Sequence, residues 1–224
     1  MAGRLDKRES AGLLSVILAV LVLGQNLKAN EKQPADANKP PEIRSDFPIE
    51  DASDPNQLLR SKWDAVALVL QKNDINEQTK ADEIDRIITP AFDFTLMAKL
   101  ALGEKQWSKL NQRQCEDFTR LFVDKLRSMY REKISAYNND VATLKPPVES
   151  RKGTTWIPME IVSQERNVGL LYKLRKADDR WKIYDVEIEG VSVLLTYRAQ
   201  FEDILSKGTI EDLLTRLAEK QPAQ

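Results

Sequence analysis

The chain has 224 residues, 42% of them hydrophobic and 31% charged, which is typical of one or two globular domains rather than a disordered or fibrous protein. Its 34 basic and 35 acidic residues nearly balance, so there is no basic face for nucleic acid, and the nucleotide-binding motifs GxGxxG and GxxxxGKS/T do not occur. The absence of histidine and the single cysteine, Cys115, exclude Ser-His-Asp and Cys-His nucleophiles, His-ligated zinc or haem, and an internal disulfide.

The first 29 residues have the three-part pattern of a secretory signal peptide. Arg4, Lys7 and Arg8 precede an apolar run, Ala11 to Leu23, which is shorter than the roughly 20 residues that span a bilayer. We expect cleavage after Ala29; retention of the segment as a membrane anchor is the alternative. Without it the chain keeps 30 basic and 33 acidic residues, and we expect a periplasmic protein.

Residues 30–53 are predicted to form a flexible linker. They include four prolines among polar residues and have neither a helical nor a strand period. The following residues, 54–221, are predicted to form one domain that is large enough to bury a substantial core.

Four helices are predicted in the first part of this domain. Asp54 caps the first helix, and apolar residues at helical spacing follow it. Residues 76–88 form the second helix and residues 92–102 a very apolar third, which ends at Gly103. The longest helix spans 111–137 and carries an apolar stripe made of Phe118, Leu121, Phe122, Leu126, Met129, Tyr130 and Ile134.

The apolar period then changes to two, which predicts strands at 141–146, 154–162, 168–175 and 180–188, the last two joined as a hairpin. A helical period returns from Val191, and after Gly208 the residues Thr209 and Asp212 predict the capped start of a final helix. Strands between two groups of helices indicate the α+β class. We expect a curved antiparallel sheet of about four strands packed against several helices in a single domain.

Two groups of side chains could carry function. Asp185, Glu187 and Glu189 alternate along the last strand and share one face, where they could bind a divalent cation, act in acid–base catalysis or only form ion pairs. The opposite face of this strand points inward, toward the long helix. There the aromatic and aliphatic side chains form either a filled core or a cavity for acyl chains, lined by Phe118, Phe122, Leu126, Met129, Tyr130, Tyr172, Tyr184 and Val186.

Three stretches of the chain resemble one known family. They are FDFTLMAKLALGEKQWSKLNQRQCEDFTRLF at 92–122, DRWKIYDVEIEGVS at 179–192 and TYRAQFEDILSKGTIEDLLTRL at 196–217. In this order and spacing they are similar to the periplasmic MlaC-type phospholipid-binding proteins, also called the toluene-tolerance family. The similarity extends over residues 57–220, nearly the whole predicted domain.

The resemblance implies a helix-and-sheet domain with a deep apolar pocket that takes phospholipid tails and leaves the head group outside. It also implies a carrier that shuttles lipid between an outer-membrane lipoprotein complex and an inner-membrane ABC lipid transporter, and thereby maintains outer-membrane lipid asymmetry. Such a carrier requires no catalytic residue, no metal and no cofactor.

Two other hypotheses stay open on the sequence. One is an enzyme on a similar curved sheet with Asp185 or Glu187 as the base, although strand alternation directs Tyr184 and Val186 inward instead. The other is a non-catalytic structural adaptor with a filled core. For the carrier, we further predict that Arg198 pairs with Asp185 and fixes the helix after the sheet against the sheet edge.

Overall fold

The computed structural model of this protein describes residues 54–131, 141–148, 153–162 and 167–219. The predicted signal peptide and linker lie outside the described residues, as do Ile134 and the end of the predicted domain. The side chains of Met129 and Tyr130 are outside them as well. None of the helices in the described ranges combines the length and the apolar character that crossing a membrane requires.

Helices precede and follow the sheet in the chain, and capping residues define where several of them begin. They are α2 (Pro55–Gln71), α3 (Glu77–Ile88), the 3₁₀ helix η1 (Thr89–Ala91), α4 (Phe94–Leu102), α5 (Glu104–Trp107), α6 (Gln112–Arg131), α7 (Val193–Lys207) and α8 (Ile210–Ala218). Asp54 caps α2, Asp93 caps α4, and Thr209 forms the predicted capping box of α8 with Asp212. These side chains accept hydrogen bonds from backbone N–H groups of the first helical turn, which have no partner within the helix.

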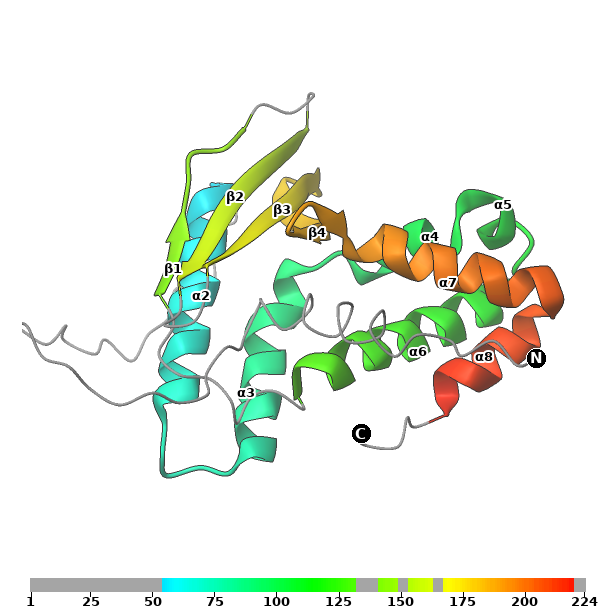
Figure 1. The fold of residues 1–224 in the computed structure, drawn as a ribbon, viewed down its shortest axis with the longest axis horizontal. Helices are drawn as coiled ribbons and strands as arrows, with labels where there is room; N and C mark the ends of the chain where they lie inside the picture. Colours follow the sequence, from blue (N-terminus) through cyan, green and yellow to red (C-terminus); the bar gives the residue numbers. More distant parts are fainter. Residues whose placement is uncertain (1–53, 132–140, 149–152, 163–166, 220–224) are drawn as a thin grey trace, which may run out of the picture.

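The strands form one antiparallel sheet in the order β1-β2-β3-β4-β5, and Figure 1 shows it beside the helices. They are β1 (Val141–Leu144), β2 (Thr154–Val162), β3 (Asn167–Ala177), β4 (Arg180–Ile188) and β5 (Val191–Ser192). The predicted α+β class and the four predicted strands are confirmed. Residues 191–192, which we expected at the start of a helix, instead pair with the end of β4 as a short fifth strand.

Two tight turns hold β4 in register with its neighbours. Asp178 and Asp179, between β3 and β4, have φ values of 49° and 61°. Positive φ at both central residues defines the hairpin turn whose twist matches the twist of the flanking strands. Glu189 and Gly190, between β4 and β5, have φ values of 50° and 79° and form a second turn of this kind.

A β-bulge in β4 changes which residues face the interior. Leu174 pairs with Ile183, whereas Lys173 pairs with Asp185, so Tyr184 is an extra residue without a partner on β3. One extra residue reverses the inward and outward alternation along a strand. The buried position on this part of β4 is therefore Ile183, and Tyr184 is only half-buried. This corrects the prediction that Tyr184 points inward.

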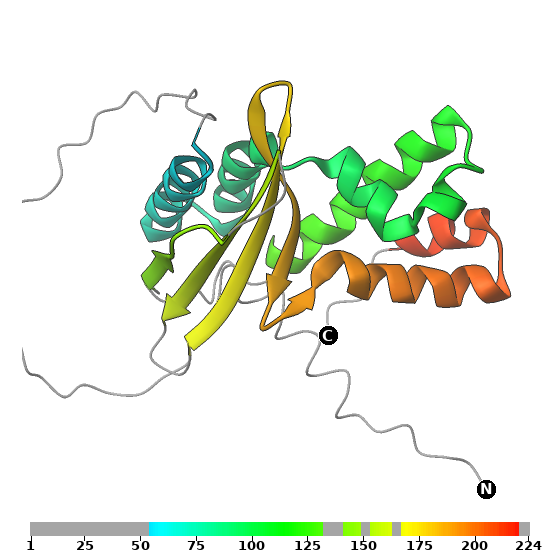
Figure 2. The same ribbon diagram turned by 90° about the horizontal axis from the view of Figure 1, so that it is seen from above.

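Most of the buried apolar residues of the described ranges belong to two clusters. Figure 2 shows the elements that carry them: the sheet with α2 lies on one side of the molecule, and α4, α6, α7 and α8 lie on the other. The sheet cluster, between the sheet and α2, consists of Leu58, Leu59, Ala91, Ile157, Met159, Ile161, Val168, Leu170, Tyr172, Leu174, Ile183, Val186 and Ile188. The helix cluster, within α4, α6, α7 and α8, consists of Met97, Ala98, Ala101, Leu102, Phe118, Phe122, Leu194, Tyr197, Phe201 and Leu213. Phe92 and Val193 pack against both clusters.

Candidate functional site

An apolar cavity, partly open to solvent, lies where the two clusters meet. Its volume is about 150 Å³, roughly ten times the space that one buried water needs. The wall consists of Leu59, Lys62, Trp63, Val66, Ile84, Asp85, Ile88, Thr89, Ala91, Phe92, Phe94, Met97, Leu126, Arg127, Tyr172, Ile183, Val186, Ile188 and Val193. Because most of these side chains offer water no hydrogen bond, an apolar ligand gains free energy by displacing water from the cavity.

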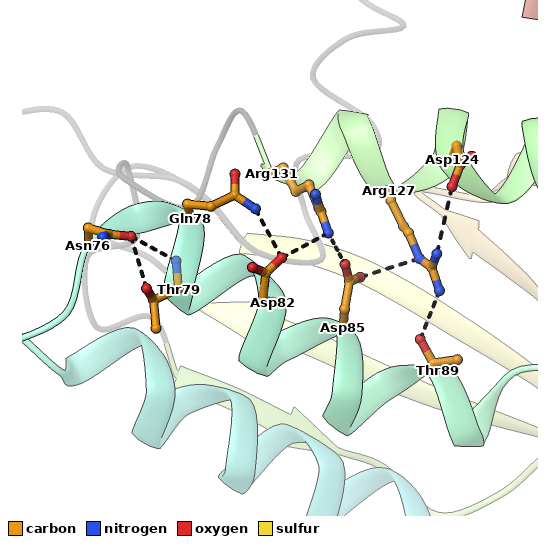
Figure 3. A network of polar contacts seen from close by, with 9 residues as sticks. All are labelled: Asn76, Gln78, Thr79, Asp82, Asp85, Thr89, Asp124, Arg127 and Arg131. Atoms are coloured by element: carbon orange, nitrogen blue, oxygen red, sulfur yellow. Dashed lines mark hydrogen bonds and ion pairs between the residues drawn. The ribbon is translucent and has the colours of Figure 1, made fainter. Parts of the chain in front are cut away.

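Polar side chains join α3 to α6, as Figure 3 shows, and three of them, Asp85, Thr89 and Arg127, also line the cavity. Asp85 on α3 forms ion pairs with two residues of α6, with Arg127 at 3.5 Å and with Arg131. Arg127 also donates a hydrogen bond to the hydroxyl of Thr89 at 3.2 Å, and its guanidinium lies 6.0 Å from the ring centroid of Phe94. These contacts fix the spacing of α3 and α6 and so define this side of the cavity.

We expect Asp85→Ala to lower the free energy of unfolding by about 1–2 kcal/mol, because two guanidinium groups lose their shared carboxylate. The Asp85 side chain is 13% exposed, so solvent compensates for only part of this loss. Urea unfolding measures the change. The matched control is Asp117→Ala on the outer face of α6, where the carboxylate is 42% exposed; we expect a change within about 0.5 kcal/mol there. Equal losses in the two variants would contradict a special role for Asp85.

Three of the predicted lining residues lie in the cavity wall: Leu126 on α6, Tyr172 on β3 and Val186 on β4. Tyr172 and Val186 are cross-strand partners, so their side chains are neighbours on the inner face of the sheet. Burial raises the pKa of the Tyr172 phenol well above its ordinary value, although the nearby Trp63 side chain acts in the opposite direction. The phenol is therefore neutral, as the apolar surroundings require.

Phe118 and Phe122, predicted for the same wall, lie in the helix cluster instead. Both side chains are completely buried, and their rings contact Phe201 of α7 edge to face, with ring centroids 5.5 and 5.8 Å away. At Phe118 and Phe122 the stripe on α6 thus faces α7 and not the sheet. Among the stripe residues with described side chains, Leu126, one turn after Phe122, is the one in the cavity wall.

Most of the wall residues that we did not predict come from α2, α3, η1 and the start of α4. Their apolar spacing was visible in the sequence, but spacing alone does not tell a core position from a cavity position. Those without any prediction as lining residues include Leu59, Lys62, Trp63, Val66, Ile84, Ile88, Phe92, Phe94, Met97 and Ile183.

Asp185, considered above as a catalytic base, is buried outside the cavity, and its carboxylate is already hydrogen-bonded and ion-paired within the protein. Its side chain accepts hydrogen bonds from the Ser192 hydroxyl at 2.7 Å and from the backbone N–H of Leu194 at 3.3 Å. It also forms an ion pair with Lys173 at 3.3 Å, and Glu187 pairs with the same ammonium group. Asp185 therefore connects β4 to the first turn of α7.

The predicted pair of Asp185 with Arg198 is wrong. Arg198 donates from Nε to Glu202, one turn later in α7, at 2.9 Å, and its guanidinium lies beside Gly103 at the end of α4. The cation that pairs with Asp185 is Lys173 on β3. Asp185 also accepts a hydrogen bond from the hydroxyl of Ser192, the N-cap residue of α7. The helix is fixed to the sheet edge as expected, but through its capping residue.

An antiparallel sheet that encloses an apolar cavity together with helices is suited to a protein that binds an apolar ligand. The chain belongs to the MlaC family, since the family model described as MlaC protein matches residues 61–219. The resemblance stated from the sequence is thereby confirmed.

Two relatives illustrate the similarity. The toluene tolerance protein ttg2D of Pseudomonas putida is 24% identical over 128 residues, which cover 57% of this chain and 60% of that protein, less than two thirds of its length. The phospholipid-binding protein from Ralstonia solanacearum, solved in complex with a phospholipid, has a similar fold, with a TM-score of 0.67 and 25% identity. The match covers 73% of this chain and 94% of the Ralstonia chain.

Proposed function

We propose that this protein is a lipid carrier that holds the acyl chains of a phospholipid in the cavity between the sheet cluster and the helix cluster. The cavity itself carries the proposal, because its wall is apolar on both sides and it is partly open to solvent. Membership of the MlaC family and the phospholipid in the similar Ralstonia protein support the choice of ligand.

The energetics of lipids explain why such a carrier is needed. Each CH₂ group that leaves an apolar environment for water costs about 0.8 kcal/mol, so a two-chain lipid does not cross water unaided at a useful rate. A protein cavity that replaces part of the bilayer contacts lowers this cost, and it needs no reactive group.

We propose that the carrier works in the periplasm, between an outer-membrane lipoprotein complex and an inner-membrane ABC lipid transporter, and supports the lipid asymmetry of the outer membrane. The predicted signal peptide and the family membership support this location and these partners.

Two observations favour a carrier over the alternatives raised by the sequence. Asp185 and Glu187 share Lys173 and lie outside the cavity wall, which speaks against either as a base acting on a ligand there. An adaptor with a filled core would have no reason to keep an open apolar cavity, because unfilled apolar space costs stability.

Native mass spectrometry of the protein purified from cells tests the proposal. We expect a population with one bound phospholipid, and an intact mass that corresponds to a chain starting near Asn30. A protein that arrives empty and takes up no lipid from phospholipid vesicles would contradict the carrier. A full-length chain confined to the membrane fraction would contradict cleavage of the signal peptide and hence a freely diffusing carrier.

A further inference from the structure

A lysine side chain interrupts the apolar cavity wall on the side formed by α2. Lys62 lines the cavity and is half-buried. Within the part of the chain that the structure describes, Lys62 takes part in no hydrogen bond and no ion pair. A partly buried ammonium group without a partner is costly, because burial removes water that would otherwise solvate its charge.

A second lysine increases the positive charge at this position. Burial and the charge of Lys182 on β4 both lower the pKa of Lys62. Lys182 itself donates a hydrogen bond to the backbone carbonyl of Pro90 in η1, which holds its ammonium group between β4 and η1. Lys182 is not part of the cavity wall, but its ammonium group is close enough to Lys62 for the two positive charges to repel each other.

The neighbouring charges leave this positive charge uncompensated. The pKa of Lys182 is lowered by burial and by the nearby charge of Arg180. The carboxylate that favours its charged form is Asp93, and Asp93 already accepts hydrogen bonds from Arg175, one of them at 2.8 Å, while its other oxygen caps α4. The carboxylate near Lys182 is thus already bound to Arg175 and to the first turn of α4.

The other basic residue of the cavity wall, Arg127, has partners for its charge. Arg127 is neutralised by Asp85 and Asp124 and hydrogen-bonded to Thr89. An anionic group of a ligand in the cavity would therefore gain little at the α3–α6 side and much at the α2 side.

We propose that Lys62, with Lys182 beside it, binds the phosphate of a phospholipid head group at the edge of the cavity. This site rests on the proposed function, because it requires the acyl chains of the same lipid in the cavity. A phosphodiester carries one negative charge and several acceptor oxygens, and an ammonium group donates up to three charge-assisted hydrogen bonds. The half-buried position of Lys62 suits a ligand whose chains lie inside and whose head group lies in water.

A competition between two lipids tests the site. Delipidated protein is incubated with vesicles that contain phosphatidylglycerol and diacylglycerol with the same acyl chains in equal amounts, and native mass spectrometry gives the ratio of the two bound lipids. We expect Lys62→Met to lower the ratio of phosphatidylglycerol to diacylglycerol by about tenfold, the effect of one charge-assisted hydrogen bond. Lys62→Arg should keep most of the preference, because the charge and the donors remain.

The matched control is Lys125→Met on α6. Lys125 is also half-buried and lies outside the cavity wall, so the ratio should remain that of the wild-type protein. A separate titration with glycerophosphoglycerol, the head group without acyl chains, distinguishes a lipid head group from a free phosphate ester. Binding of this compound as tight as that of the whole lipid would overturn a site that depends on the chains.

The results for the two lipids keep the site and the carrier function apart. A preference for phosphatidylglycerol that is unchanged in Lys62→Met would overturn the phosphate site while the carrier function stands. An equal loss of both lipids in Lys62→Met, with a lower Tm, would assign Lys62 to the structure of the wall and also overturn the site. Wild-type protein that takes up neither lipid would contradict the carrier function itself.

Discussion

Val186→Asp and Leu126→Asp should each remove nearly all bound phospholipid from the purified protein. Either substitution places a carboxylate without a partner in an apolar wall, which costs several kcal/mol when the cavity is filled with acyl chains. Val186 belongs to β4 and Leu126 to α6, so the two variants act from the sheet side and from the helix side of the cavity. The amount of lipid phosphate extracted per mole of protein measures the effect.

Leu195→Asp is the control for these variants, because Leu195 is 63% exposed on α7 and should not affect lipid content. Thermal unfolding is measured in parallel, since Val186 is 7% exposed and a charge there also destabilises the fold. Leu126 is only half-buried, so Leu126→Asp should remain folded. Full lipid content in folded Leu126→Asp would show that the chains do not occupy this cavity.

Asp185→Ala should be the most destabilising substitution in the polar contacts between the sheet and α7. It removes a carboxylate that is 5% exposed and leaves the Ser192 hydroxyl, the Leu194 N–H and Lys173 without this partner. We expect a loss of about 3 kcal/mol in the free energy of unfolding, which corresponds to a decrease in Tm of roughly 6–12 °C for a domain of this size. Calorimetry of the purified protein measures both quantities.

Arg198→Ala is the matched control for this second prediction. Its guanidinium pairs with Glu202 within one exposed helix face, and such pairs contribute about 0.3–0.5 kcal/mol. Asp185→Asn should fall between the two, because it keeps an acceptor oxygen but not the charge. A loss in Arg198→Ala as large as that in Asp185→Ala would contradict the contacts described for both residues.

The stripe on α6 illustrates what periodicity predicts well and what it does not. The spacing of Phe118, Phe122 and Leu126 correctly predicted a long helix with one buried face. It did not reveal that the first two residues pack against α7 while the third reaches the cavity. That difference depends on the direction in which α6 crosses its neighbours, which is a tertiary property that the period of a single helix does not contain.

The bulge in β4 illustrates a second limit. Strict alternation correctly placed Val186 in the interior, but it also placed Tyr184 there. Tyr184 has no partner on β3, and this extra residue reverses the alternation of inward and outward side chains, so that Ile183 points inward instead. A bulge arises from pairing with the neighbouring strand, so the sequence of β4 alone carries little sign of it. The strand period likewise placed Asp185 on the outer face, but it could not predict the hydrogen bond from Ser192, because that contact depends on how the chain folds after β4.

The meeting of the sheet cluster and the helix cluster has a consequence for the range of molecules that the cavity can hold. Phe92 and Val193 pack against both clusters, and these two residues also line the cavity. A small separation of the two clusters would therefore widen the cavity without opening the packing within either cluster. If the protein carries a lipid as proposed, a bulkier or more unsaturated acyl chain would disturb the contacts between the two clusters and leave the close packing within each cluster unchanged.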